Sequence, residues 1–396
     1  MAPPDRTTPS VRPPRKRSGP IRVGLVGFGN VAVYGHVPAY ANLTELFEVV
    51  ALADPTPARL EMGREMLGLD PGDVHLDAAA MLARDDVEVV DICTPQHLHR
   101  AIAVPAAESG KHVLCEKPLA TTPRDAALMV AAARSAGVAL GVVHNYLFLP
   151  EIAKMVSLLR AGRIGRIEVA ILNYLGVLDL PGNASYRPGW RHDPTQAGGG
   201  VLMDMLHIVY VAEALLGAPL ERVSAYMAAR EEGSPVEDIA LCRFETDRSA
   251  ALVNMGWGMG PGGIEVSGPD GRISIRYQGG ATSPFVPLET MTVVDRQGTH
   301  AIEVEGEADS LTPLLRDFGA AIVEGREPIA PGEQALRTLE ATVAAYASGA
   351  TGRTIELPFV PGDPVYEFGV GALGKLDLPA WSPLRRRGLF AFETGS

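Results

Sequence analysis

The first third of the chain alternates short apolar runs with amphipathic stretches. Apolar runs bounded by turn residues predict buried strands at residues 22–26, 47–53, 87–93, 111–115 and 138–143. Helical patterns lie between these runs, up to about residue 43 and at residues 57–67, 75–82 and 123–136. Strands that alternate with helices are typical of an α/β fold with a doubly wound parallel sheet, the Rossmann arrangement.

The pattern changes beyond residue 150, where strands follow one another with turn residues between them. The expected strands lie at residues 166–175, 222–229, 238–245, 250–255, 264–267, 272–277, 290–294 and 301–304. This succession predicts a large, open, mostly antiparallel sheet. Helices expected at residues 201–216, 310–324 and 332–349 would cover one face of it. We expect the other face to form a homodimer or homotetramer.

With 396 residues, the chain is too long for one compact core and predicts two domains. Residues 1–20 are rich in proline and arginine and are expected to be a disordered tail. Residues 21–144 form the expected Rossmann domain, and residues 145–357 a substrate-binding and oligomerisation domain. Residues 358–396 read as a C-terminal extension.

Composition excludes some classes of function. The net charge of −12 argues against nucleic acid as a main partner. No apolar run approaches the roughly 18 residues of a membrane helix, so no membrane association is expected. The three cysteines have no metal-type spacing and predict buried thiols in a reducing compartment, with the cytoplasm as the default.

A glycine-rich turn follows the first expected strand. It reads Gly27-Phe28-Gly29-Asn30 and continues to Ala32, the G-x-G-x-x-A form of the dinucleotide fingerprint. Gly27 allows the tight turn, and Gly29 lets backbone N–H groups approach a pyrophosphate. The diphosphate would lie at the helix N-terminus, which favours negative charge.

The second expected strand ends at Asp54, 25 residues beyond Gly29. A carboxylate near this spacing contacts the ribose hydroxyls of NAD and repels the 2′-phosphate of NADP. Asp54 could instead close a turn before Pro55. Arg59 could pair with a phosphate, so NAD is the expected cofactor and NADP stays open.

Polar residues also follow the later strands of the first domain. Ligands bind at the carboxyl ends of strands in such sheets. The expected cofactor contacts there are Thr94, Pro95, His97, Glu116 and Lys117. Lys117 could also stabilise a developing alkoxide, although a simple pair with Glu116 would explain its position as well.

The expected helix 201–216 follows three glycines and carries Asp204 and His207 three residues apart. A carboxylate beside an imidazole suits a proton relay. No third ligand has a clear claim, so no metal is assigned. A long polar loop precedes the helix and favours a substrate-facing role. The expected substrate contacts are Asn145, Tyr146, Trp190, Arg191 and Tyr210.

Several motifs together resemble the glucose–fructose oxidoreductase/inositol dehydrogenase/MocA family. They are GLVGFGN (24–30), CTPQHLH (93–99), CEKPLA (115–120), HNY (144–146), WRHDPTQAGGGVLMDMLH (190–207), VEDIALCRFE (236–245) and EVSGPDGRISI (265–275). The resemblance covers residues 21–357. It implies NAD or NADP, a sugar or cyclitol substrate, and catalytic roles for Lys117, Asp204 and His207. Many members carry D-x-G-x-H-x-x-D, where this chain has Leu206 in place of the glycine and Tyr210 in place of the last acid.

The sequence therefore predicts an NAD(P)-dependent oxidoreductase that moves a hydride between nicotinamide and a secondary hydroxyl or ketone of a sugar, cyclitol or sugar derivative. Two other functions stay open. One is a glycosidase or lyase that recycles bound NAD through transient sugar oxidation. The other is a non-catalytic NAD(P)-binding regulator, which would not need Lys117, Asp204 and His207 together.

Overall fold

The computed structural model describes residues 19–177, 199–230, 234–258, 260–280, 286–306 and 309–376. Its contacts divide the chain into two compact units. The first takes the described residues up to Leu119, together with Asp125–Val143 and Leu311–Glu333. The second takes Ala120–Arg124, and the described residues of His144–Ser310 and from Gln334 onward.

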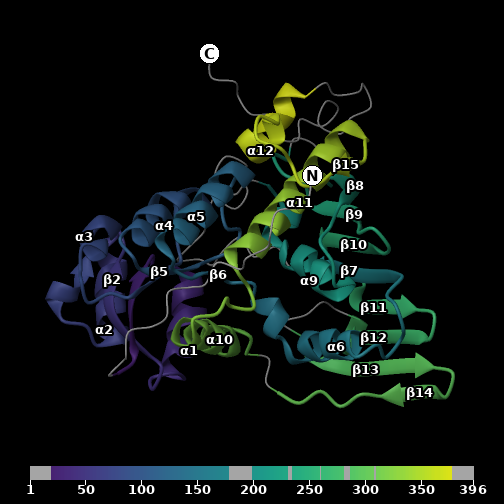
Figure 1. The fold of residues 1–396 in the computed structure, drawn as a ribbon, viewed down its shortest axis with the longest axis horizontal. Coiled ribbons are helices and arrows are strands. Elements are labelled where there is room, and N and C mark those ends of the chain that lie inside the picture. The colour runs from purple at the N-terminus through teal and green to yellow at the C-terminus, as the bar shows by residue number, and fades with distance from the viewer. Residues whose placement is uncertain are drawn as a thin grey trace, which may run out of the picture. The chain divides into compact units, whose positions relative to one another are not determined.

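The first unit is built on a parallel six-stranded sheet (Figure 1). Its strands are β1 (Ile21–Val26), β2 (Phe47–Ala53), β3 (Val74–His75), β4 (Val89–Ile92), β5 (His112–Cys115) and β6 (Leu140–Val142). They lie in the order β3-β2-β1-β4-β5-β6, with every neighbouring pair parallel. This is the doubly wound Rossmann order, so the predicted fold class is confirmed.

Helices follow the strands of this sheet. They are α1 (Val37–Ala41), α2 (Pro57–Leu67), α3 (Ala78–Leu82), α4 (His99–Glu108) and α5 (Pro123–Ala136). A further helix of this unit, α10 (Leu311–Glu324), comes from a later part of the chain. The predicted helix after the glycine turn is interrupted, because Ala32–His36 forms a π-helical segment, η1, before α1. The helix predicted at residues 75–82 was also too long, since its first residue belongs to β3.

Helix α10 completes the core of the first unit, although it lies far along the chain. Phe318 of α10 packs on Gly141 of β6, where an added Cβ would lie 2.6 Å from the ring. Gly319 of the same helix meets Leu46 and Phe47 at the start of β2. Missing side chains at Gly141 and Gly319 therefore let this late helix approach the sheet closely.

The second unit is built on a nine-stranded sheet (Figure 1). Its strands are β7 (Val169–Val177), β8 (Arg222–Ala228), β9 (Ile239–Glu245), β10 (Ala250–Trp257), β11 (Gly262–Gly268), β12 (Gly271–Tyr277), β13 (Leu288–Asp295), β14 (Gly298–Ala301) and β15 (Ile355–Glu356). The order is β14-β13-β12-β11-β7-β10-β9-β8-β15. Only the β7–β10 pair is parallel, so the predicted mostly antiparallel sheet is confirmed.

One face of this sheet packs on helices and the other bears exposed apolar side chains. The helices of the second unit are α6 (Pro150–Arg160), α8 (Val201–Asp204), α9 (His207–Leu216), α11 (Gly332–Thr351) and α12 (Pro364–Phe368). Helix α9 packs on β7 and β10. On the opposite face, Tyr226 is 55% exposed, Leu241 38% and Leu252 40%.

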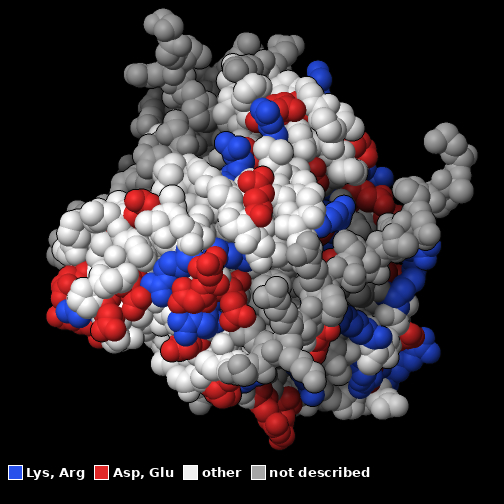
Figure 2. Space-filling model, turned by 60° about the vertical axis from the view of Figure 1, so that its left-hand side comes forward, with Lys and Arg blue, Asp and Glu red and all other residues white. Residues whose placement is uncertain are grey.

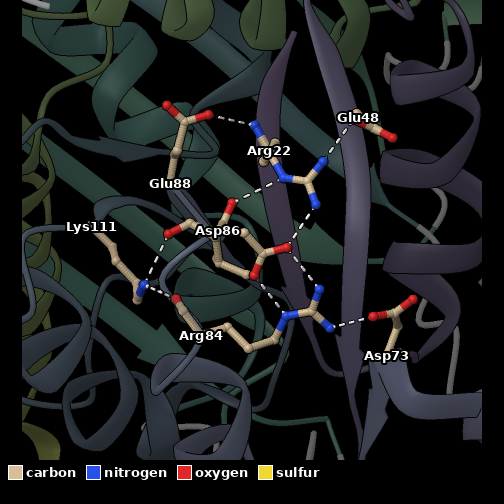
Figure 3. A network of polar contacts seen from close by, with 8 residues as sticks. Arg22, Glu48, Asp73, Arg84, Asp86, Glu88 and Lys111 are labelled. Atoms are coloured by element: carbon tan, nitrogen blue, oxygen red, sulfur yellow. Dashed lines mark hydrogen bonds and ion pairs between the residues drawn. The ribbon is translucent and has the colours of Figure 1, made fainter. Parts of the chain in front are cut away.

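Side chains of both charge signs lie close together on the described surface shown in Figure 2. Figure 3 shows one such network at the amino ends of the first unit's strands. Arg22 of β1 pairs with Glu48 at 3.2 Å and with Asp86 at 2.6 Å, and Asp86 also pairs with Arg84 at 2.8 Å. These contacts lower the pKa of Asp86 well below its ordinary value, chiefly through the Arg84 hydrogen bond. The network ties the strand starts together, opposite the edge where the polar motifs lie.

Candidate active site

The glycine turn of the first unit combines one crowded position with one open position. Gly27 has φ 88°, and an added Cβ would lie 2.8 Å from the carbonyl oxygen of Cys93. A side chain there would be strained and would also collide with the backbone that follows β4. An added Cβ on Gly29 meets nothing within 4 Å. Gly29 therefore leaves space above the turn, which a pyrophosphate needs.

Asp54 braces this turn from the end of β2. Its Oδ2 accepts a hydrogen bond from Phe28 N–H at 2.8 Å, and its Oδ1 accepts one from Thr56 N–H at 2.8 Å. A carboxylate offers about four lone-pair sites, so these two bonds leave capacity for ribose hydroxyls. Arg59 donates to the Phe28 carbonyl at 2.6 Å, which places its guanidinium against the same turn.

The ends of β4 and β5 are joined through His99, which the sequence placed in a loop next to the cofactor and which is the first residue of α4. It is buried, and its Nε2 lies 2.8 Å from the Thr94 carbonyl, while Nδ1 lies 3.0 Å from the Pro118 carbonyl. Burial lowers the pKa of His99. The Thr94 hydroxyl is buried and has no hydrogen-bond partner among the described residues, which suits a ligand contact. His97, in the following turn, is exposed.

Lys117 directly follows Glu116 at the end of β5. The Lys117 N–H donates to Glu116 Oε2 at 2.9 Å, and the peptide bond to Pro118 is cis. Glu116 is 8% exposed, whereas Lys117 is half-buried. The first unit thus brings the glycine turn, Asp54, Thr94 and the Glu116–Lys117 pair to the carboxyl edge of one sheet.

Aromatic rings hold His207 in the second unit. The ring of Tyr146 stacks on His207 with centroids 4.1 Å apart, and His144 stacks on Tyr210 at 3.9 Å. His207 Nδ1 lies 2.7 Å from the Tyr210 hydroxyl, which also accepts a hydrogen bond from Tyr146 N–H at 3.1 Å. Tyr210 is fully buried, and both its hydroxyl and its ring contact His207.

The prediction of one continuous helix over residues 201–216 was wrong. Helix α8 ends at Asp204 and α9 begins at His207, with Met205 at φ −99° and ψ 25° between them. Asp204 is partly exposed. Together with burial and Tyr174, its charge raises the pKa of Tyr146 well above the ordinary value. Asp204 and His207 therefore lie on either side of a helix break. The charge of Asp204 also reaches the Tyr146 hydroxyl.

A buried carboxylate, Glu237, holds the start of α8 and was missed in the sequence. Its oxygens accept from Gly200 N–H at 3.0 Å, Leu202 N–H at 2.9 Å and the Tyr346 hydroxyl at 2.7 Å. An added Cβ at Gly199 would collide with the Tyr346 hydroxyl, and one at Gly200 with the Glu237 carbonyl. The glycines before α8 are thus required by this close packing. The acid in the VEDIA stretch was the available signal.

The other predicted substrate contacts have different outcomes. Asn145 lies in the short 3₁₀ segment Asn145–Phe148, and its amide donates to the Ser310 hydroxyl at 2.8 Å. Tyr146 is 4% exposed, in contact with His207. Trp190 and Arg191 lie outside the described residues.

Comparison with known families and proteins covers most of the chain. The family model described as "Oxidoreductase family, NAD-binding Rossmann fold" matches residues 21–144. Its companion, "Oxidoreductase family, C-terminal alpha/beta domain", matches residues 156–357. Both carry the GFO/IDH/MocA designation.

Several individual relatives are sugar dehydrogenases and reductases. The 1,5-anhydro-D-fructose reductase of Ensifer adhaerens is 32% identical over 85% of this chain and 98% of its own. The D-apiose dehydrogenase of Paraburkholderia graminis is 27% identical over 84% and 88%. Among solved structures, the aldose-aldose oxidoreductase of Caulobacter crescentus, complexed with glycerol, aligns at a TM-score of 0.76 with 26% identity, covering 85% of this chain and all of that one.

Glu237 should make stability depend on pH. Burial raises its pKa from 4.5 to about 7. Because the folded protein holds this proton more tightly than the unfolded chain, the stabilisation is complete below pH 4.5 and is lost as pH rises through about 7. A shift of this size corresponds to about 3 kcal/mol. Chemical denaturation from pH 4.5 to 8 should show this fall in wild type and a smaller fall in Glu237→Gln, where Glu340 remains and burial raises its pKa to about 7 as well.

The matched substitution is Glu356→Gln, whose side chain is exposed on β15. It should keep the wild-type pH dependence. If Glu237→Gln kept it too, another group would be responsible.

Proposed function

This chain belongs to the GFO/IDH/MocA family of oxidoreductases, and we propose that it moves a hydride between NAD and a secondary hydroxyl, or the matching ketone, of a sugar or cyclitol. The observation that carries the proposal is the oriented imidazole of His207, together with Lys117 at the carboxyl edge of an NAD-binding sheet. The named relatives act on sugars and anhydrosugars, which supports that substrate class.

The residues of the first unit fit the cofactor. Gly29 leaves open space above the turn, and the buried Thr94 hydroxyl is unpartnered among the described residues. We assign the pyrophosphate to the turn Gly27-Phe28-Gly29-Asn30 and the adenosine ribose to Asp54. Thr94, Pro95, His97 and the Glu116–Lys117 pair would hold the rest. Bound NAD supplies the nicotinamide carbon that accepts or gives the hydride.

Each catalytic side chain has a separate role. Lys117 donates a hydrogen bond to the reacting oxygen and stabilises negative charge that develops there. His207 takes up or returns the hydroxyl proton through Nε2, because Nδ1 is engaged by Tyr210. Asp204 favours the charged form of the imidazole. Tyr210 and Tyr146 fix the ring, and Asn145, Trp190 and Arg191 are proposed to contact the sugar.

The exposed sheet face supports a homodimer or homotetramer. Leu252 of β10 lies opposite Arg243 of β9, and Leu241 of β9 lies opposite Tyr226 of β8. These side chains give an apolar area on an otherwise solvent-facing sheet, which is typical of an interface. Sedimentation should show an oligomer at micromolar concentration that Leu252→Glu dissociates. A monomeric wild type would contradict the assignment.

Within the described residues, every helix is too short or too polar to cross a membrane. All three cysteines are buried free thiols. This pattern suits a reducing compartment, and we propose the cytoplasm. Recovery of the protein from the periplasmic or secreted fraction would contradict that.

Catalysis should depend on Lys117 and His207. Loss of an acid–base group costs roughly 10²–10⁴-fold in rate. D-apiose and common polyols with NAD or NADP, and the ketone 1,5-anhydro-D-fructose with NADH or NADPH, should reveal a substrate through a net absorbance change at 340 nm. Lys117→Met and His207→Gln should each lower kcat/KM by that factor.

Lys154→Met is the matched control, because this lysine is exposed on α6. Near-normal turnover in both Lys117→Met and His207→Gln would contradict the catalytic roles assigned to these two residues. Turnover of sugar without a net change at 340 nm would instead indicate recycling of bound NAD.

The open position at Gly29 allows a test of cofactor binding. Gly29→Val should fold normally, since its Cβ has space, but should weaken NADH binding by about tenfold or more (~1.4 kcal/mol). Gly72→Val is the control, because an added Cβ there also meets nothing within 4 Å. Fluorescence titration with NADH measures both. Equal affinity in the two variants would place the pyrophosphate elsewhere.

A further inference from the structure

A buried histidine lies between two carboxylates below the carboxyl edge of the parallel sheet. His36 ends the π-helical segment and has no exposed surface. Its Nδ1 lies 2.7 Å from Asp91 Oδ2, and its Nε2 lies 3.2 Å from Glu116 Oε1. Asp91 belongs to β4, and Glu116 follows β5. One imidazole thus connects the first helical turn to two strands.

The contacts favour a charged His36. An ionised carboxylate only accepts hydrogen bonds, so both ring nitrogens must donate. Burial works against a charged imidazole, but the Asp91 carboxylate outweighs it and raises the pKa of His36 well above its ordinary value. Burial likewise opposes an ionised Glu116, but the His36 hydrogen bond and charge lower the pKa of that carboxyl.

The other polar groups that face this cluster are neutral. The Tyr40 hydroxyl donates to Asp91 Oδ2 at 2.9 Å, and Cys93 Sγ donates to Asp91 Oδ1 at 3.8 Å. Burial raises the pKa of Tyr40 well above its usual range and that of Cys93 to about 12. Both therefore remain protonated donors at physiological pH.

Glu116 connects His36 to Lys117, because each of its carboxylate oxygens contacts one of them. Its Oε1 faces His36, while its Oε2 accepts the Lys117 backbone N–H at 2.9 Å. The Lys117 charge also lowers the pKa of Glu116. Asp91, His36, Glu116 and Lys117 thus alternate in sign, and their charges sum to zero. Without the imidazolium, two buried carboxylates would share one cation, which low dielectric makes costly.

A metal ion is a poorer explanation of the same cluster. Ligand atoms of His36, Asp91 and Cys93 lie within 4.8 Å of one another. Two ligands of a tetrahedral zinc ion at about 2.0–2.1 Å would be about 3.3 Å apart. The Nδ1–Oδ2 distance of 2.7 Å is instead that of a charge-assisted hydrogen bond.

We propose that His36 is a positioning residue for Lys117: its buried imidazolium keeps Glu116 ionised and directed at the Lys117 backbone across the working pH range. Only the expected effect of His36 on turnover depends on the catalytic role proposed for Lys117. The link from His36 through Glu116 to Lys117 can be measured without substrate or cofactor.

The first measurement uses the wild-type protein. The chain has nine histidines. With ¹⁵N-labelled histidine, one side chain should keep both ring nitrogens protonated from pH 6 to pH 8, where ordinary histidines become neutral. If every histidine lost a ring proton by pH 8, the inference would be overturned, whatever the variants do.

The second measurement follows Lys117 directly. The chain has five lysines, which reductive methylation with ¹³C-formaldehyde labels without removing their charge. Lys117→Arg assigns the Lys117 signal. In wild type this signal should be flat from pH 5 to pH 8. In His36→Gln, Glu116 loses the buried imidazolium and keeps only the half-buried Lys117 charge, while Asp91 keeps its Tyr40 donor. Glu116 should therefore take up a proton within this range and give the signal an inflection.

The double variant His36→Gln/Glu116→Gln should abolish the inflection, which assigns it to Glu116. Tyr40→Phe is the matched control, because it removes a donor to Asp91 without changing a charge in the cluster. It should leave the Lys117 signal flat. A flat signal in folded His36→Gln, verified by near-ultraviolet circular dichroism, would also overturn the inference.

Turnover separates this inference from the proposed function. With the substrate found in the screen, kcat of His36→Gln should fall about tenfold as pH drops through the inflection, and wild type should not show this fall. If Lys117→Met were fully active, the catalytic assignment would fail while the inflection could still be observed. If Lys117→Met were inactive and His36→Gln kept the wild-type pH profile, the positioning role would fail alone.

Discussion

Two carboxylates buried next to one another need a cation between them, and His36 supplies it to Asp91 and Glu116. The requirement arises because parallel strands all present their carboxyl ends at one edge, which gathers polar residues from different parts of the chain. A single imidazolium satisfies both acids and ties η1 to the ends of β4 and β5. The same edge carries the glycine turn, so the cofactor-binding backbone and Lys117 share one electrostatic support.

In the second unit, a buried carboxylate is stabilised by neutral hydrogen-bond donors in place of a cation. Glu237 is as deeply buried as Asp91, but its partners are the Gly200 and Leu202 N–H groups and the Tyr346 hydroxyl. These neutral donors do not offset burial, which explains why the pKa of Glu237 rises while that of Glu116 falls. In each unit a buried acid holds the segment that carries a proposed catalytic residue.

Periodicity and strand ends predicted most of the architecture, because burial of alternating or continuous apolar positions acts locally along the chain. The interruption between Asp204 and His207 was not predictable, since neither Met205 nor Leu206 is a helix breaker. The π-helical turn that ends at His36 was also missed, although Gly35 lies within it. Glu237 and Tyr346 meet across more than 100 residues, so no short motif could reveal their contact. A strand end and helical spacing singled out Lys117, Asp204 and His207, and the family resemblance implied their catalytic roles, but only coordinates showed that the Tyr210 hydroxyl contacts His207 Nδ1.

The position of α10 has a consequence for how the protein is made. The first unit is complete only with Leu311–Glu333, so a ribosome must synthesise more than three-quarters of the chain before that core can close. Until then, the surface around Gly141 and Phe47 that Phe318 and Gly319 cover stays open to water. A fragment that stops at residue 144 would keep every strand of the parallel sheet but expose this surface. The nucleotide-binding half is therefore contiguous as a motif and discontinuous as a folding unit.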